Sequence, residues 1–164
     1  MLGYMPDREP FVLADVLDRA ALAAAHREAL LVLRPQLHAV EIDPASANWP
    51  PEQTRAVEAL HEIGARQGRW PPRNRPFART GVDLDPRADA EFEILVALSP
   101  YTLLADGWDQ DHVNIYDAND EGGLWLNLST EEHAQIVECL GGDGHALTPH
   151  ARRRSLWRRI LGPR

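Results

Sequence analysis

Between residues 117 and 123 the chain reads DANDEGG, its densest run of polar side chains. An EF-hand calcium loop places oxygen ligands at positions 1, 3 and 5, glycine at position 6 and a bidentate glutamate at position 12. Position 12 is Leu128 here, so the bidentate ligand is missing. Asx and Gly residues also suit a chain reversal, because they tolerate positive φ and bond locally. We interpret the run as a turn. The positions that fit the calcium pattern are Asp117, Asn119, Glu121 and Gly122.

Other patterns that carry chemistry are also incomplete. His61 and Glu62 begin the H-E-x-x-H motif of zinc proteases, but the second imidazole position holds Ala65. Cys139 lies among apolar residues, where we expect a small buried side chain. The sequence has no G-x-S-x-G elbow and no Gly-rich phosphate loop. We therefore assign no catalytic residue, no metal and no cofactor, and we interpret the protein as non-enzymatic.

Length and composition indicate one folded domain over residues 1–150, followed by a basic amphipathic tail over residues 151–164. The longest apolar region contains five charged residues, which argues against a membrane span. We recognise no secretory signal, and a single cysteine cannot form an internal disulfide, so we expect a cytoplasmic protein. All 17 basic residues are arginine, and much of the rest is Ala, Gly and Pro. This bias is typical of GC-rich genes, from which we expect a bacterial source.

The charge is divided unequally along the chain. Residues 1–79 hold ten arginines and ten acidic residues, whereas residues 80–151 hold fifteen acidic residues and only Arg87 as a base. Residues 152–164 then hold six arginines and no acid. A strongly acidic region repels nucleic acid and attracts basic partners, although it also serves solubility alone.

The elements that position these residues are expected to be both helices and strands. Helices are predicted over 15–34, 51–67 and 86–99, ended by Pro35, Gly68 and Pro100 respectively. A short strand is predicted over 37–42, and three strands over 101–105, 112–116 and 124–128 form an antiparallel meander. Ser129 and Glu132 form a capping box that opens a further helix. The expected fold is α+β: a helical N-terminal half packed on a small antiparallel β-meander, then a capped helix and a basic C-terminal tail.

Alternation along the meander predicts a surface. His112, Asn114 and Tyr116 share one face of their strand, and Trp125 and Asn127 share one face of the next. Aromatic residues ringed by acids are typical of a contact surface for a basic protein. The alternatives are that a helix covers this face or that it is a plain solvated sheet. The expected partner-binding residues are Trp108, Asp109, Asp111, His112, Asn114, Tyr116, Asp117, Asp120, Glu121, Trp125 and Asn127.

These observations favour a binding protein whose acidic surface engages a basic protein partner. An immunity-type inhibitor of a basic toxin, such as a nuclease, is one concrete version of this hypothesis. A hydrolase with a carboxylate and histidine site, at His112 or His133, is an alternative. A second alternative is a nucleic-acid or membrane adaptor that acts through the arginines of 152–159; we expect no other nucleic-acid contact. The tail also has the opposite charge to the acidic region, onto which it is able to fold back.

Overall fold

The computed structural model describes residues 8–13, 18–45, 49–71, 81–119, 123–141 and 147–150. Within them the chain forms one seven-stranded antiparallel sheet and four α-helices, which confirms the α+β class. The order of the strands across the sheet is β3-β2-β4-β5-β6-β1-β7. The strands are β1 (Glu9–Leu13), β2 (Ala39–Ile42), β3 (Val82–Leu84), β4 (Leu104–Trp108), β5 (Asn114–Asn119), β6 (Gly123–Leu128) and β7 (Leu147–Pro149).

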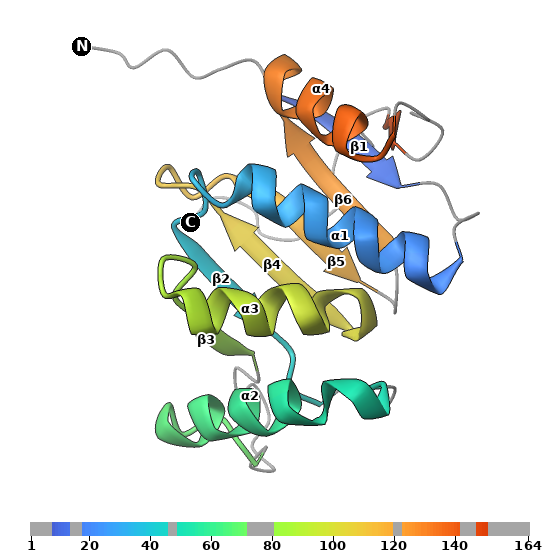
Figure 1. Cartoon of the computed structure of the whole chain (residues 1–164). Helices are drawn as coiled ribbons and strands as arrows, with labels where there is room; N and C mark the ends of the chain where they lie inside the picture. The colour runs from blue at the N-terminus through green and yellow to red at the C-terminus, as the bar shows by residue number, and fades with distance from the viewer. Residues whose placement is uncertain are drawn as a thin grey trace, which may run out of the picture.

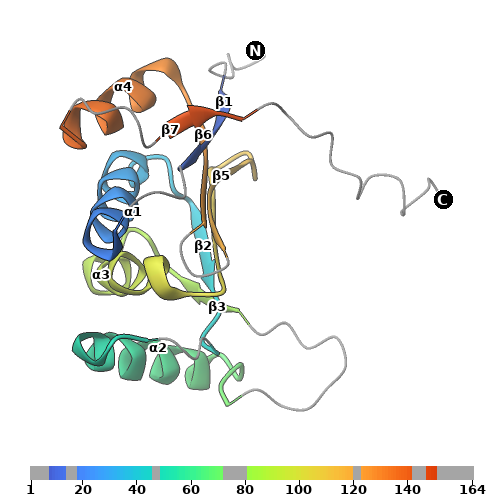
Figure 2. The same ribbon diagram turned by 90° about the vertical axis from the view of Figure 1, so that its right-hand side faces the viewer.

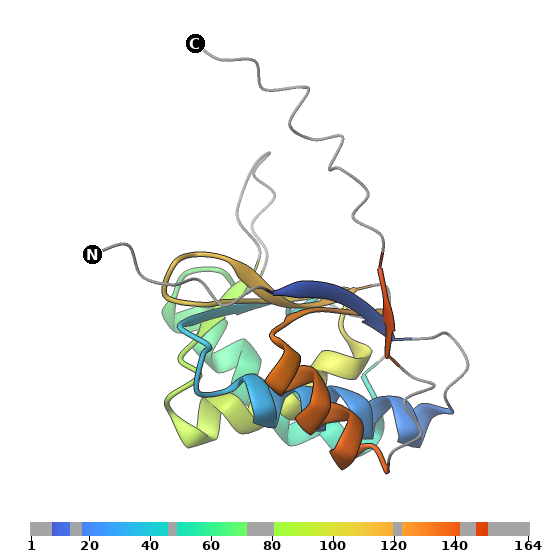
Figure 3. The ribbon, with the colours of Figure 1, turned by 90° about the horizontal axis from the view of Figure 1, so that it is seen from above.

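The four helices lie side by side on a single face of this sheet (Figures 1 and 2). Figure 3 shows the resulting two layers from above, with strands on one side and helices on the other. Of the described elements, none covers the second face of the sheet, which we call the open face. The helices are α1 (Arg19–Leu33), α2 (Thr54–Arg66), α3 (Asp89–Leu98) and α4 (Thr130–Cys139).

Helix α1 crosses the middle of the sheet because its inner side is built from small and apolar residues. The Asp18 side chain accepts a hydrogen bond of 2.8 Å from the Ala21 amide and so caps the first turn. The helix therefore begins after Asp18 and not near residue 15 as predicted, and it ends before Pro35 as expected. Its buried residues recur at helical spacing, and they are Ala25, His26, Ala29, Leu30 and Leu33.

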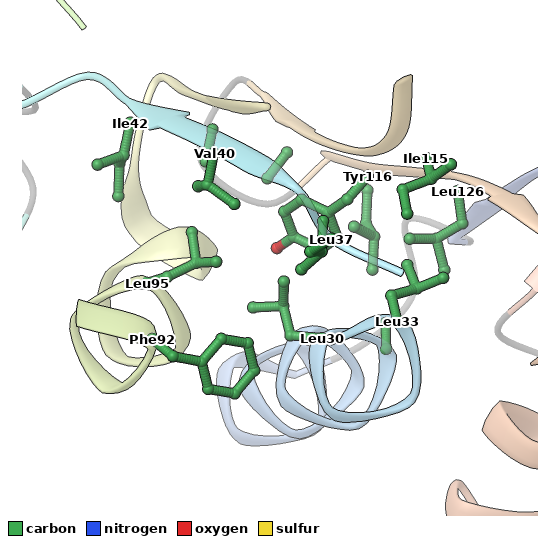
Figure 4. Packing of buried hydrophobic residues seen from close by; sticks show 14 of the residues in the cluster. Leu30, Leu33, Leu37, Val40, Ile42, Phe92, Leu95, Ile115, Tyr116 and Leu126 are labelled. Atoms are coloured by element: carbon green, nitrogen blue, oxygen red, sulfur yellow. The ribbon is translucent and has the colours of Figure 1, made fainter. Parts of the chain in front are cut away.

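The buried side chains of the sheet and the helices form one hydrophobic core. Figure 4 shows Leu30 and Leu33 of α1 and Leu95 of α3 directed toward the apolar side chains of the strands. Val40 and Ile42 of β2 are almost completely buried, because alternate residues of a strand point to the same face. The remaining residues of each strand therefore point to the open face.

The predicted C-terminus of α2 and the predicted N-terminus of α4 are confirmed. Helix α2 follows a 3₁₀ turn at Pro51–Gln53 and stops before Gly68, which has a φ of 71°. Helix α4 begins with the expected capping box, in which Ser129 accepts from the Glu132 amide and Glu132 accepts from the Ser129 amide. Cys139, at the end of this helix, is exposed, so its predicted burial is wrong.

Helix α3 and strand β4 start later in the sequence than predicted. Asp85 accepts hydrogen bonds from the amides of Arg87 and Ala88, which forms a turn in place of the expected helical start. A 3₁₀ turn at Ser99–Tyr101 follows α3, so the strand predicted over 101–105 begins at Leu104. The meander itself is confirmed, as β4, β5 and β6.

The predicted tail over 151–164 lies outside the described residues, as do Asp120 and Glu121. Within the part that the structure describes, no helix has the length and apolar character needed to cross a bilayer.

Candidate functional site

The open face carries a carboxylate on each of four neighbouring strands. Glu41 of β2 lies directly opposite Asp83 of β3 on one side and Asp106 of β4 on the other. Asp106 in turn lies opposite Asp117 of β5. Because directly opposed residues of an antiparallel sheet point to the same face, these four side chains form a line across the strands. We call this line, Asp83–Glu41–Asp106–Asp117, the carboxylate row.

Two neighbouring members of the row, Asp106 and Asp117, have raised pKa values. Burial raises the pKa of the Asp106 carboxyl to about 6; the charge of Asp117 adds to this, a hydrogen bond from Asn114 opposes it, and Glu41 contributes less. Burial likewise raises the pKa of Asp117, against a hydrogen bond from Asn119. Among the described residues, no basic side chain contacts Asp106 or Asp117. At Asp106 and Asp117 the row therefore carries negative charge that no basic side chain of the described residues neutralises.

The other two members of the row, Asp83 and Glu41, are held by local structure. Asp83 forms an ion pair of 2.7 Å with Arg69, whose guanidinium also donates to the Gly81 carbonyl. The Glu41 carboxylate lies over Gly81, where it occupies the space that any side chain at this position would fill. The glycine thus permits a glutamate on β2 to lie flat against the neighbouring chain.

An aromatic residue continues the row beyond Asp117. Trp125 of β6 lies directly opposite Asp117 and is 40% exposed, which is unusual for so large an apolar side chain. A hollow of about 170 Å³ separates it from the neighbouring polar groups and is also lined by Asn114, Asp117 and Asn127. Among the described residues, the buried side-chain oxygen of Asn127 has no hydrogen-bond partner. The hollow therefore combines a carboxylate, two amide side chains and an indole ring.

The structure brings several of the sequence-predicted residues together on this face. Asn114, Asp117, Trp125 and Asn127 all line the hollow. Trp108 lies opposite Asn114 at the end of β4, and with His112 it lines a second hollow of about 810 Å³ where β2 begins.

Asp109 and Asp111 belong to the turn between β4 and β5. The Asp109 carboxylate accepts from the amides of Asp111 and Val113, and His112 has a φ of 59°. Asp109 therefore holds the backbone of the turn, which is a structural role.

The prediction that Tyr116 faces outward is wrong. Tyr116 is completely buried, and its hydroxyl lies 2.7 Å from Nδ1 of His26 in α1. The register between β4 and β5 shifts at Gly107 and Trp108, which leaves Ile115 as an extra residue on β5. Such a bulge reverses the alternation, so Asn114 points to the open face and Tyr116 points to the core. Burial raises the pKa of the Tyr116 phenol well above its ordinary value, which keeps it protonated.

The second hollow has the composition expected for the hydrolase alternative, since it contains His38 and His112 together with acidic residues. These acidic side chains, however, already form contacts with neighbouring residues. Asp83 pairs with Arg69, and Glu91 accepts from the Asp85 amide. The other histidine of that hypothesis, His133, stacks on Phe11 with its ring centre 4.2 Å away. In the described ranges, no three His, Cys, Asp or Glu side chains are grouped to hold a metal ion.

No protein-family model, curated protein or solved structure matches this chain.

Sequence reasoning missed three members of the carboxylate row, namely Asp83, Glu41 and Asp106. Each lies between two apolar residues in the sequence or beside one, as in Val82-Asp83-Leu84. That pattern indicates a half-buried strand, but only the pairing of distant strands shows that the acids are neighbours.

Proposed function

We propose that this protein binds a basic protein partner through its open face and performs no chemical step there. The carboxylate row carries this proposal, because it concentrates negative charge on four adjacent strands and leaves Asp106 and Asp117 without a basic neighbour in the described chain. Opposed like charges destabilise a sheet, and burial increases that cost. A cationic partner neutralises the opposed carboxylates. The free energy of their repulsion is then relieved on binding and favours the complex.

The spacing of the row suits a basic helix. Neighbouring strands lie about 4.8 Å apart, so the row presents one carboxylate about every 5 Å. Arginine side chains one turn apart on an α-helix repeat at about 5.4 Å. A helix laid across the strands therefore meets Glu41, Asp106 and Asp117 with successive cations on one side.

The hollow beside Trp125 suits arginine in particular. A guanidinium is planar, carries five N–H donors and stacks on aromatic rings. The Asp117 carboxylate supplies an acceptor, and the exposed indole supplies an aromatic ring for stacking.

An immunity-type inhibitor of a basic toxin, for example a nuclease, is the concrete form of this proposal. Nucleic-acid enzymes present basic surfaces to phosphates, and an acidic face is complementary to such a surface. The net excess of acids over residues 80–151 also accelerates encounter with a basic protein at low salt.

The test compares two double variants of equal charge. Asp106→Asn/Asp117→Asn removes two charges from the open face, whereas Glu58→Gln/Glu62→Gln removes two exposed charges from α2 in the opposite layer. Candidate basic partners are first selected by gel filtration at low and at high salt, and calorimetry then measures their affinity. We expect the first variant to lose at least tenfold in affinity and the second to bind like the natural chain. Equal affinities for the two variants would exclude the open face as the binding surface.

A further inference from the structure

Strand β7 delivers the chain to the open face. The His150 ring lies 4.1 Å from the ring of Trp125, and the His150 amide donates to the Pro10 carbonyl over 2.8 Å. Trp125 lies directly opposite Asp117, at the end of the carboxylate row. The residues that follow His150 therefore begin beside the candidate site.

Residues 151–164 are positively charged, opposite in sign to the carboxylate row. Residues 151–164 contain six arginines and no acidic residue, and four large apolar side chains lie among the arginines. The open face carries the complementary groups: carboxylates on β3, β2, β4 and β5, and an exposed indole on β6. The apolar residues of the segment are Leu156, Trp157, Ile160 and Leu161.

The segment is long enough to cover the whole row. In the strand order, Asp117 is three strands from β7 and Asp83 is six, which correspond to about 14 Å and about 29 Å at the usual strand spacing. Fourteen residues span about 46 Å when extended and about 21 Å as a helix. An extended segment thus reaches every carboxylate of the row, and a helical one reaches Asp117 and Asp106.

We propose that residues 152–164 are an intramolecular ligand of the open face, which a basic partner must displace. The first arginines enter the hollow beside Trp125, within two or three residues of His150, and the later ones lie along the row toward Glu41. This inference rests on the proposed function in that both assign the same face as a receptor for cationic side chains.

On the helical side, a hollow of about 550 Å³ lies between α1 and α3 and is lined by Arg27 and Arg34 together with Glu93. Arg34 also lies over the Phe92 ring, with its guanidinium carbon 4.3 Å from the ring centre. A basic segment therefore meets two arginines in this hollow, whereas the carboxylate row presents it with acids.

The first test locates the segment in the full chain. Cys139 is replaced by serine, a nitroxide is attached through Leu161→Cys, and relaxation enhancement is measured for the backbone amides at low salt. We expect the amides of Asp106 and Asp117 to broaden several-fold more than that of Glu58 on α2. The effect should not change on dilution and should be lost at about 0.5 M salt, where the screening length is only a few ångströms. Broadening that is concentrated on α2, uniformly weak, or dependent on protein concentration would overturn the proposal.

The second test uses a matched full-length variant in which the five arginines of 152–159 are replaced by glutamine. A synthetic peptide of residues 151–164 serves as the probe in calorimetry. We expect the peptide to bind the glutamine variant at least tenfold more tightly than the natural chain, whose own segment competes. Equal binding to both proteins, or to neither, would contradict an intramolecular ligand.

The two proposals fail separately. If the segment does not contact the face but Asp106→Asn/Asp117→Asn still loses its partner, the intramolecular ligand is wrong and the proposed function stands. If the segment contacts the face but the partner binds equally well to this variant, the proposed function is wrong and the intramolecular ligand stands.

Discussion

Asp106 and Asp117 lie at directly opposed positions of β4 and β5, and in the described chain each has only an asparagine as its hydrogen-bond partner. Neutral amides offset part of the cost of placing two carboxylates side by side, but they do not remove the charge. The two strands therefore stay paired at this position although the pair carries a local excess of negative charge. This relationship supports binding over stability as the reason for the row, since an ion pair would stabilise the sheet better.

Replacing Asp106 by asparagine should make the protein more stable at neutral pH. The folded state raises the pKa of Asp106 from 3.8 to about 6, so it binds the proton more tightly than the unfolded state does. Stability contributed by this group therefore falls as pH rises from about 4 to about 6. Allowing for solvent screening of a half-exposed carboxylate, we expect a gain of about 1 kcal/mol for Asp106→Asn at pH 7. Urea denaturation from pH 4 to pH 7 measures it.

The gain should become small near pH 4, where the natural side chain is protonated in the folded state and only partly ionised in the unfolded state. Asparagine keeps the oxygen that accepts from Asn114, so the hydrogen bond at this position is preserved. Glu58→Gln on α2 is the control for removing an exposed carboxylate from the opposite layer. A gain for Asp106→Asn that does not vary with pH would refute the assigned linkage.

Tyr116→Phe should lower stability without affecting the binding of a basic partner. It removes the hydroxyl that hydrogen-bonds to His26, and both side chains are completely buried. We expect a loss of about 1 to 2 kcal/mol in the free energy of unfolding. Calorimetry with the partner should give the affinity of the natural chain. Weakened binding by a folded Tyr116→Phe protein would return this residue to the contact surface.

Trp125→Ala should show the opposite behaviour. The indole is 40% exposed, so we expect its loss to change the free energy of unfolding by less than about 1 kcal/mol. Affinity for the basic partner should fall at least tenfold, because exposed aromatics at the centre of a contact surface contribute most of the binding energy. Together, Tyr116→Phe and Trp125→Ala test whether the core face determines the free energy of unfolding and the open face determines the affinity for the partner.

Glu132→Ala should destabilise the protein more than Ser129→Ala does. Besides its part in the capping box, Glu132 accepts hydrogen bonds of 2.7 and 2.9 Å from Arg8, and little of either side chain is exposed. Removing the carboxylate leaves a largely buried guanidinium without its charged partner, at a cost of about 3 kcal/mol. The Ser129 cap is worth about 1 kcal/mol. Thermal denaturation of both variants measures the difference; equal losses would show that the ion pair adds nothing to the cap.

Gly107→Ala should lower stability through a direct clash. A Cβ atom at this position would lie 2.6 Å from Leu37 and 3.2 Å from the Cβ of Tyr116. Because both neighbours are buried in the core, we expect a loss of about 2 kcal/mol. Gly141→Ala is a useful comparison: nothing lies within 4 Å of its Cβ, and its cost comes only from a φ of 83°. Urea denaturation of the two variants separates steric from conformational effects.

Local patterns predicted a substantial part of the fold. The capping box at Ser129, the end of α2 at Gly68 and the meander of β4, β5 and β6 all depend on residues that are close in the sequence. Strands β1, β3 and β7 were not predicted, because they contain only three to five residues and are defined by pairing with distant segments. Short strands of this kind carry little periodicity of their own.

The candidate site was predicted less completely than the fold, for two physical reasons. Alternation placed Asn114, Trp125 and Asn127 on a common face, and the structure agrees. The bulge opposite Gly107 reversed the direction of Tyr116, which no pattern within β5 indicates. Glu41 and Asp83 join the row only through the pairing of β2 with β3 and β4, so their proximity is a property of topology.

Covering only one face of the sheet divides the strand residues into two nearly independent sets. Val40 and Ile42 maintain the packing with the helices, whereas Glu41 between them faces outward and contributes to none of it. Substitutions at outward-facing strand positions therefore change the proposed binding surface and leave the core residues in place.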